Sequence, residues 1–285
     1  MMILGYTNFC HVLSNQIYYR LDEPLTDGRM KAMYFDEGHY RGNSNCLNFN
    51  RSNITTDNIP GWSVNRYRSW SDLYKTVRFC NMFFENIDKV PFTSAVIDGK
   101  TLKDRMTGEV HFLRAMIYHE LVSDYGGVPL IIDVYSLEDE FAVARNTYEE
   151  CINFIVDECD KAAELLPLNN TGANNGRATK GAALSLKSRV LLYAASDLHN
   201  TYQFAGYANP ELIGYTSGSQ ADRWLKAKNA AKAVIDLNLY SLYKAVPAPG
   251  DSIADNIANI FVSRQTEEDI FIKYLLTSNG NEDLL

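Results

Sequence analysis

The stretch GEVHFLRAMIYHELVSDYGGVPL, residues 108–130, decides how this sequence is interpreted. It is predominantly apolar, and we predict a long helix over Leu102–Tyr125 that contains most of it. The following residues predict the end of that helix, because Gly126 and Gly127 permit left-handed backbone and Pro129 prevents the helix from resuming. Two histidines, two glutamates and an arginine also lie in the stretch. It is therefore either a metal or acid/base site, or the inside of a helical scaffold.

The spacing of these residues argues against a metal or phosphate site. On one helix His111 and His119 lie about 12 Å apart along the axis, whereas two ligands of one zinc ion must each lie about 2.1 Å from it. His119-Glu120 is not followed by the second histidine of an HExxH metal motif. The two glycines follow a helix, whereas a phosphate-binding loop places its glycines ahead of one. We therefore expect no metal ion and no cofactor here.

The charged residues of the stretch are better explained as scaffold. Arg114 lies on an apolar helix and, if buried, needs a carboxylate or carbonyl partner. Glu109 lies about 140° from Arg114 around the helix, so each needs a partner on a neighbouring helix, although Glu109 can also pair locally with Arg105. We interpret Glu109, Arg114 and Tyr118 as residues that pin neighbouring helices.

Helical patterns continue on both sides of this stretch. The clearest covers residues 147–166, where Thr147 and Glu150 form a capping box ahead of one apolar stripe. Thr179 is placed to cap the next helix, which is apolar on two sides and so is expected between two neighbours. The predicted helices are Trp70–Val90, Leu102–Tyr125, 147–166, Lys180–Asp197 and Ala221–Leu237. The fold class is therefore mainly α, with helical hairpins stacked as in an α-solenoid, irregular loops and a few short strands.

The two ends differ from this helical middle. We expect residues 1–65 to be an irregular segment that wraps the helices, residues 66–243 to form the helical core, and residues 244–285 to begin a less regular region. Within the last region, DIFIKYLL (residues 269–276) is the best strand candidate.

Composition excludes several classes of partner and site. The net charge is -8 and no run of Lys or Arg offsets it, so we expect no nucleic-acid partner. No apolar run approaches the roughly 20 residues that span a bilayer. The five cysteines show no CxxC pair, and Cys151 and Cys159 are predicted to be buried thiols in a helical core. Acidic pairs such as Asp157-Glu158 are interpreted as solvated faces.

Several motifs, taken in order, resemble the SusD/RagB family of nutrient-binding outer-membrane lipoproteins of Bacteroidetes. The resemblance covers roughly residues 70–243 and extends more weakly to residue 276. Its pieces are WSDLY (70–74) with Asn81, GEVHFLRAMIY (108–118), YGGVPL (125–130), RNTYEE (145–150), Leu166-Pro167, GRATKGAA (176–183) and KSRVLLY (187–193).

The resemblance implies a tetratricopeptide-like helical core and a function without catalysis. Such proteins capture glycans or other nutrients at the cell surface and cover a SusC-like TonB-dependent transporter of a starch-utilisation type of system. The family's signal peptide and acylated cysteine are not recognisable, and Cys10 does not fit that role. We therefore expect an N-terminal lipid anchor outside this chain and a missing C-terminal part.

The ligand contacts are expected in the loop before residue 70. Aromatic faces cover the apolar side of a sugar, while amides and guanidinium groups satisfy its hydroxyls. Trp62, Asn65, Arg66 and Tyr67 combine these groups in one loop, and Tyr40 lies in a similar loop. The alternative for these aromatics is that they pack the loop onto the helices.

Two other functions stay open at this point. A tetratricopeptide-like scaffold for protein partners would have a groove suited to peptides and no small-molecule ligand. An α-helical glycosidase would need two carboxylates facing each other across a cleft.

Overall fold

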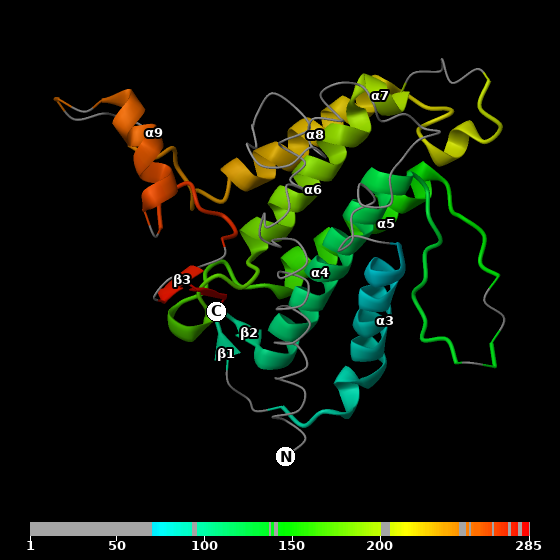
Figure 1. Cartoon of the computed structure of the whole chain (residues 1–285), viewed down its shortest axis with the longest axis horizontal. Helices are drawn as coiled ribbons and strands as arrows, with labels where there is room; N and C mark the ends of the chain where they lie inside the picture. Colours follow the sequence, from blue (N-terminus) through cyan, green and yellow to red (C-terminus); the bar gives the residue numbers. More distant parts are fainter. Residues whose placement is uncertain are drawn as a thin grey trace. The chain divides into compact units, whose positions relative to one another are not determined.

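The computed structural model describes residues 70–92, 96–136, 138–139, 142–200, 206–244, 249–250, 252–263, 265–272, 275–278 and 281–284 (Figure 1). The chain divides into two compact units, residues 1–79 and 80–285, and the division falls within the first described helix. That helix, α3, spans Trp70–Asn86 and continues as a 3-10 turn, η2, at Ile87–Lys89. The helix predicted over Trp70–Val90 is confirmed, and it ends in this tighter turn.

The second unit is built on four long helices that lie side by side, each running against the one before it (Figure 1). They are α4 (Leu102–Tyr125), α5 (Tyr148–Leu165), α6 (Lys180–Ala195) and α8 (Gln220–Ile235). Shorter pieces join or follow them: η3 (Gly172–Asn174), α7 (Asp197–Asn200), η4 (Pro210–Leu212) and α9 (Ile253–Val262). The mainly α prediction of stacked helical hairpins is confirmed.

The predicted caps hold the ends of these helices. Glu150 N–H donates to Thr147 Oγ1 at 3.2 Å, and Thr147 N–H donates back to Glu150 Oε2 at 2.8 Å. The bond from the Thr147 backbone lowers the pKa of Glu150. Thr179 accepts from Ala182 N–H at 3.2 Å at the start of α6. Thus side chains close in sequence satisfy backbone donors that the helix itself leaves open.

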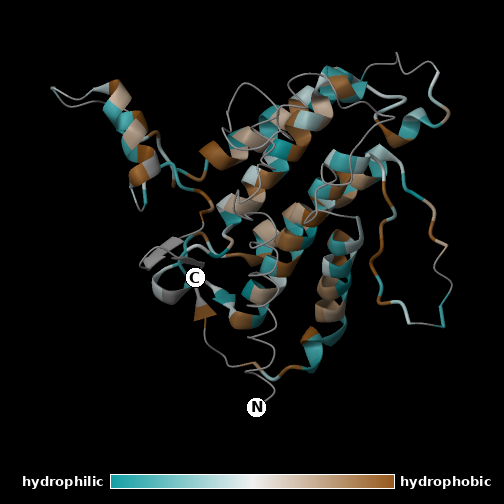
Figure 2. Ribbon diagram, viewed as in Figure 1, coloured by the Kyte–Doolittle hydropathy of each residue, from teal (hydrophilic) through white to brown (hydrophobic). Residues whose placement is uncertain are grey.

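Helix α6 packs between α5 and α8, as its two apolar sides predict (Figure 2). Part of its contact with α8 is a buried cluster of Leu191 and Ala195 of α6 with Ala227 and Ala230 of α8. The small alanines let the two helices approach closely. Tyr193, although it belongs to the apolar residues of this helix, is 57% exposed.

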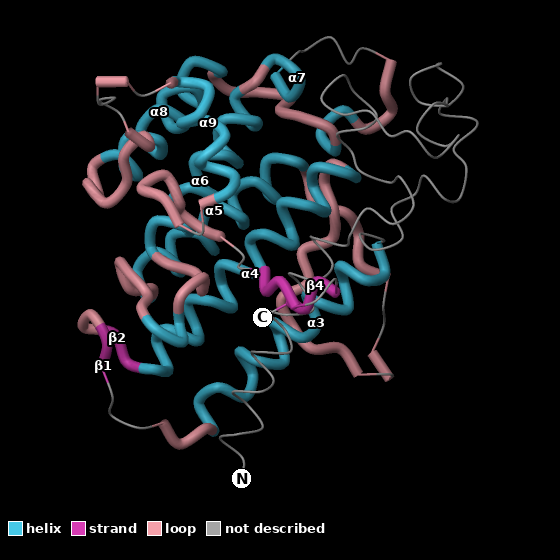
Figure 3. The backbone as a smooth tube through the Cα atoms, turned by 60° about the vertical axis from the view of Figure 1, so that its left-hand side comes forward, coloured by secondary structure: helices cyan, strands magenta, loops and turns pink. Residues whose placement is uncertain are grey.

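The strands are short and form two hairpins (Figure 3). Strands β1 (Val96–Ile97) and β2 (Lys100–Thr101) pair across a turn in which Asp98 and Gly99 both have positive φ. Strands β3 (Leu275–Ser278) and β4 (Asn281–Leu284) form the second pair.

The predicted strand over residues 269–276 is wrong for its first half. Asp269 instead closes a turn, because its carboxylate accepts from Thr266 N–H at 2.6 Å and its own N–H donates back to Thr266 O at 3.3 Å. The helix α9 was not predicted. Its start is capped by Ser252, whose hydroxyl accepts from Asp255 N–H at 3.4 Å.

The cysteines of the described part behave as core residues. Cys80, Cys151 and Cys159 are buried free thiols, which confirms the prediction for Cys151 and Cys159. Burial raises the pKa of Cys159 to about 12, so this thiol stays protonated. Among the described helices, none has both the length and the apolar character needed to cross a membrane.

Candidate functional site

The polar centre of α4 is a buried charge cluster. Arg114 Nε donates to Glu158 Oε2 of α5 at 2.8 Å, and its Nη1 donates to Asn81 Oδ1 at 2.9 Å. His111 Nδ1 lies 2.8 Å from Glu158 Oε2, and Lys161 Nζ lies 3.1 Å from Glu158 Oε1. This confirms that Arg114 pins a neighbouring helix through a carboxylate.

Glu158 is 0% exposed, so the interpretation of Asp157-Glu158 as a solvated face is wrong for Glu158. Burial by itself would raise its pKa, but the hydrogen bonds from His111 and Arg114 and the charge of Arg114 outweigh burial and lower the pKa to about 2. The carboxylate is therefore ionised and matched by its neighbours, which is the arrangement of a structural ion pair.

Aromatic rings enclose the guanidinium of this cluster. Arg114 Cζ lies 4.4 Å from the centroid of the Phe84 ring and 5.5 Å from that of Phe154. The His111 ring lies 4.5 Å from Phe84, centroid to centroid. The cluster therefore joins α4 to α3 and α5 and holds these helices together. In the described part of the chain, no three His, Cys, Asp or Glu side chains are grouped to bind a metal ion.

Tyr118 and Glu109 also pin structure. The Tyr118 ring packs edge to face on Phe154 of the neighbouring helix α5, with ring centroids 5.0 Å apart, as expected. Its hydroxyl also holds a loop, and Glu109 pairs with a loop where a neighbouring helix was expected. Tyr118 Oη donates to Ile131 O at 3.1 Å and accepts from Ile131 N–H at 2.8 Å, and burial raises the pKa of Tyr118. Glu109 accepts from Arg177 Nε at 2.7 Å and also from Arg177 Nη2, in the loop before α6. The local pair between Glu109 and Arg105 does not form.

The helix stop at Gly126, Gly127 and Pro129 is confirmed, and the two glycines serve different needs. Gly126 has a φ of 73°, in the left-handed region that favours glycine. A Cβ on Gly126 would lie 2.3 Å from Leu212 O, and one on Gly127 would lie 2.2 Å from Asn146 O. The second glycine is thus required by the close approach of another backbone segment.

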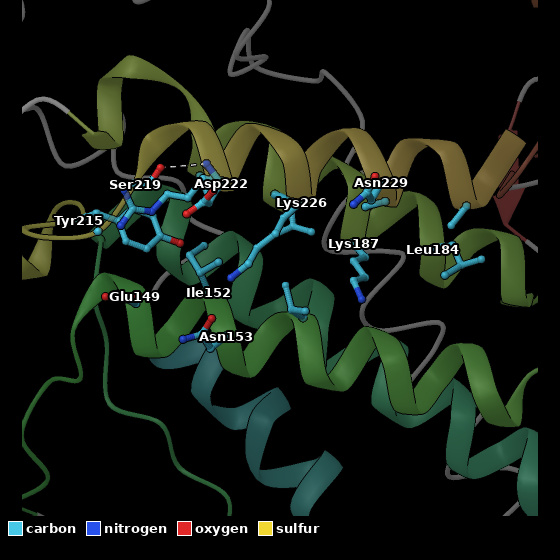
Figure 4. A pocket seen from close by; sticks show the side chains of 17 residues that line it. Glu149, Ile152, Asn153, Leu184, Lys187, Tyr215, Ser219, Asp222, Lys226 and Asn229 are labelled. Carbon is cyan, nitrogen blue, oxygen red and sulfur yellow. Dashed lines mark hydrogen bonds between the residues drawn. The ribbon is translucent and has the colours of Figure 1, made fainter.

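A groove between α5, α6 and α8 has a volume of about 560 Å³. Helix α6 forms its floor, and α5 and α8 form its walls (Figure 4). Aliphatic side chains from all three helices line the groove: Ile152, Val156, Leu184, Leu191, Ala194, Ala230 and Ala233. A volume of this size lies within the range of ligand pockets.

Polar side chains also line the two walls of the groove. Glu149 and Asn153 come from α5, while Asp222, Lys226 and Asn229 come from α8 (Figure 4). These positions recur at three- and four-residue spacing, so each helix presents one stripe to the groove. No local motif marks them in the sequence, because the groove exists only once three helices have been packed together.

The ligand-contacting residues predicted from the sequence, Trp62, Asn65, Arg66, Tyr67 and Tyr40, lie outside the described residues. Their role stays a prediction. The groove residues are separate from them in the sequence and were not predicted.

Comparisons with known proteins agree with the sequence motifs and the helical fold. Residues 8–192 match the model of a SusD-like family described as starch-binding and associating with the outer membrane. A SusD-like protein from Formosa agariphila is 23% identical over 170 residues, which cover 55% of this chain and 30% of that protein.

Solved structures extend the comparison to the fold. The crystal structure of a SusD-like protein from Bacteroides fragilis NCTC 9343 is 31% identical, with a TM-score of 0.55 over 76% of this chain and 35% of that chain. A laminarin-binding SusD-like protein is 20% identical, with a TM-score of 0.50 over 68% of this chain and 40% of that chain. The chain therefore spans less than half the length of these relatives. The likeness confirms the tetratricopeptide-like fold, and the match over residues 8–192 shows that this chain belongs to the SusD-like family.

Proposed function

We propose that the protein binds glycans or other nutrients at the cell surface, without catalysing a reaction, and delivers them to a SusC-like TonB-dependent transporter. It would be held at the outer membrane by an N-terminal lipid anchor. The observation that carries the proposal is the family match over residues 8–192, whose description names both starch binding and the outer membrane.

The buried cluster of α4 and α5 supports a binding role over a catalytic one. Its charges are matched and enclosed by rings, so it offers no free acid, base or nucleophile. Glu149 of α5 and Asp222 of α8 both line the groove, and a glycosidase needs two carboxylates across a cleft. Any test of glycan binding therefore includes a test for cleavage.

The experiment is a glycan panel applied to the full-length protein. Affinity electrophoresis and calorimetry against starch, laminarin and other polysaccharides should give saturable binding to at least one of them, and prolonged incubation should give no product. Absence of binding across the panel would contradict glycan capture. Reproducible cleavage that is lost in Glu149→Gln would overturn the non-catalytic assignment.

A further inference from the structure

We propose that the groove between α5, α6 and α8 binds an extended polypeptide segment, in addition to any glycan bound elsewhere in the protein. The polar groups of its walls are suited to a peptide backbone. Asn153 and Asn229 come from opposite walls, and their side chains make no hydrogen bond within the described part of the chain. An amide side chain both donates and accepts, as a peptide group does, so one amide on each wall can hold a main chain at two points along the groove.

The floor of the groove is suited to apolar side chains. Ile152, Leu184 and Leu191 line it together with small alanines, which leaves room for side chains that point downward from a bound segment. The lining positions of α8 run from Asp222 to Ala233, about 16 Å along the helix axis. About five residues of extended chain span that length.

The groove is poorly suited to a sugar. Tyr215 is the sole aromatic residue among the described residues that line it, and it is only 6% exposed. Arg223 Cζ lies 3.6 Å from the centroid of the Tyr215 ring and covers one of its faces. Because sugars stack on accessible aromatic faces, the lining favours a polypeptide over a glycan.

The charged side chains along the groove determine in which direction a bound segment lies. Glu149 and Asp222 lie in the first turns of α5 and α8, at one end of the groove. Lys226 lies farther along α8 and makes no hydrogen bond or ion pair within the described residues. Lys187 is already paired with Asp160 at 2.7 Å. A segment with a basic residue at the acidic end and an acidic residue near Lys226 complements this pattern.

The proposal is tested with the full-length protein and a fluorescein-labelled peptide in which a lysine and a glutamate flank three aliphatic residues. Fluorescence polarisation should show saturable binding. Lys226→Glu should weaken it at least about tenfold, a change of about 1.4 kcal/mol. The matched control is Lys228→Glu, the same charge change on α8 at an exposed position outside the groove, and it should stay within about twofold of wild type.

Two further measurements make the outcome decisive. A peptide whose glutamate is replaced by lysine should bind Lys226→Glu better than it binds wild type, which separates a charge contact from a folding defect. Asn229→Ala, which removes one wall amide without adding charge, should also weaken binding. Absence of saturable binding to wild type, or equal affinity for both lysine variants, would overturn the proposal. A further outcome is that maltoheptaose or laminarin oligosaccharides displace the peptide from wild type. If that displacement depended on Lys226, the groove would be assigned to glycans instead.

Discussion

Glu158 is a fully buried carboxylate that joins α5 to α4 in the helical core. It accepts from Arg114 and His111 inside the protein, and Lys161 approaches its other oxygen. Removing one partner of a buried ion pair typically costs about 3–5 kcal/mol, because the other charge is left uncompensated. The cluster thus explains why an arginine is placed in the middle of an apolar helix.

The lowered pKa of Glu158 predicts how stability depends on pH. A carboxylate with an unfolded pKa of 4.5 and a folded pKa of about 2 stabilises the fold above pH 4.5, and this contribution falls as pH drops toward 2. The stability advantage of wild type over Glu158→Gln should therefore shrink by about 2 kcal/mol between pH 5 and pH 3. Urea unfolding at several pH values measures it.

The control for this prediction is Glu164→Gln, which removes an exposed carboxylate from the same helix and corrects for the change in net charge. If the advantage of wild type over Glu158→Gln were the same at pH 3 as at pH 5, the lowered pKa of Glu158 would be contradicted.

At the scale of elements, the end of α4 is fixed by contacts with other segments. Gly126 N–H donates to Val122 O at 2.9 Å and closes the last turn of the helix. Gly127 N–H donates to Leu212 O at 2.6 Å, and Arg145 Nε donates to Gly127 O at 2.6 Å. The glycine pair is therefore a junction at which two distant loops meet the helix.

Gly126→Ala should destabilise the protein by about 3 kcal/mol, because a left-handed φ and a backbone clash add together. Gly172→Ala is the matched control, since Gly172 also has a positive φ of 58° but nothing lies within 4 Å of the added Cβ. The control should cost about 1 kcal/mol. Thermal and urea unfolding compare the two, and equal losses would show that the approach of Leu212 has no energetic importance.

At the scale of the whole molecule, the helical stack is a scaffold that identifies the family without identifying its ligand. The motifs that resemble the family lie largely on buried or capping residues such as Arg114, Tyr118 and Thr147. Residues of this kind fix the fold, and binding residues belong to surfaces that differ between relatives. The glycan contacts are accordingly still proposed for the loop around Trp62.

Trp62→Ala should weaken glycan binding by about tenfold, about 1.4 kcal/mol, with little change in melting temperature, because a stacked ring would be lost from a loop. Trp224→Ala is the control, since Trp224 is a 43% exposed tryptophan of α8 outside the groove lining, and it should leave the affinity unchanged. Calorimetry with a bound glycan and thermal melting measure both. A large drop in melting temperature with unchanged affinity would show that Trp62 packs the loop instead.

The sequence by itself determined the long helices, the caps of α5 and α6 and the family, because these depend on residues that are close along the chain. Thr147 and Glu150, three positions apart, make the same cap wherever the helix lies. It did not determine that Glu109 pairs with Arg177, 68 positions away, or that Glu158 is buried. Nor did it reveal the groove. These features depend on which faces of separate helices meet, and only the tertiary structure decides that, since packing brings together side chains that no local pattern connects.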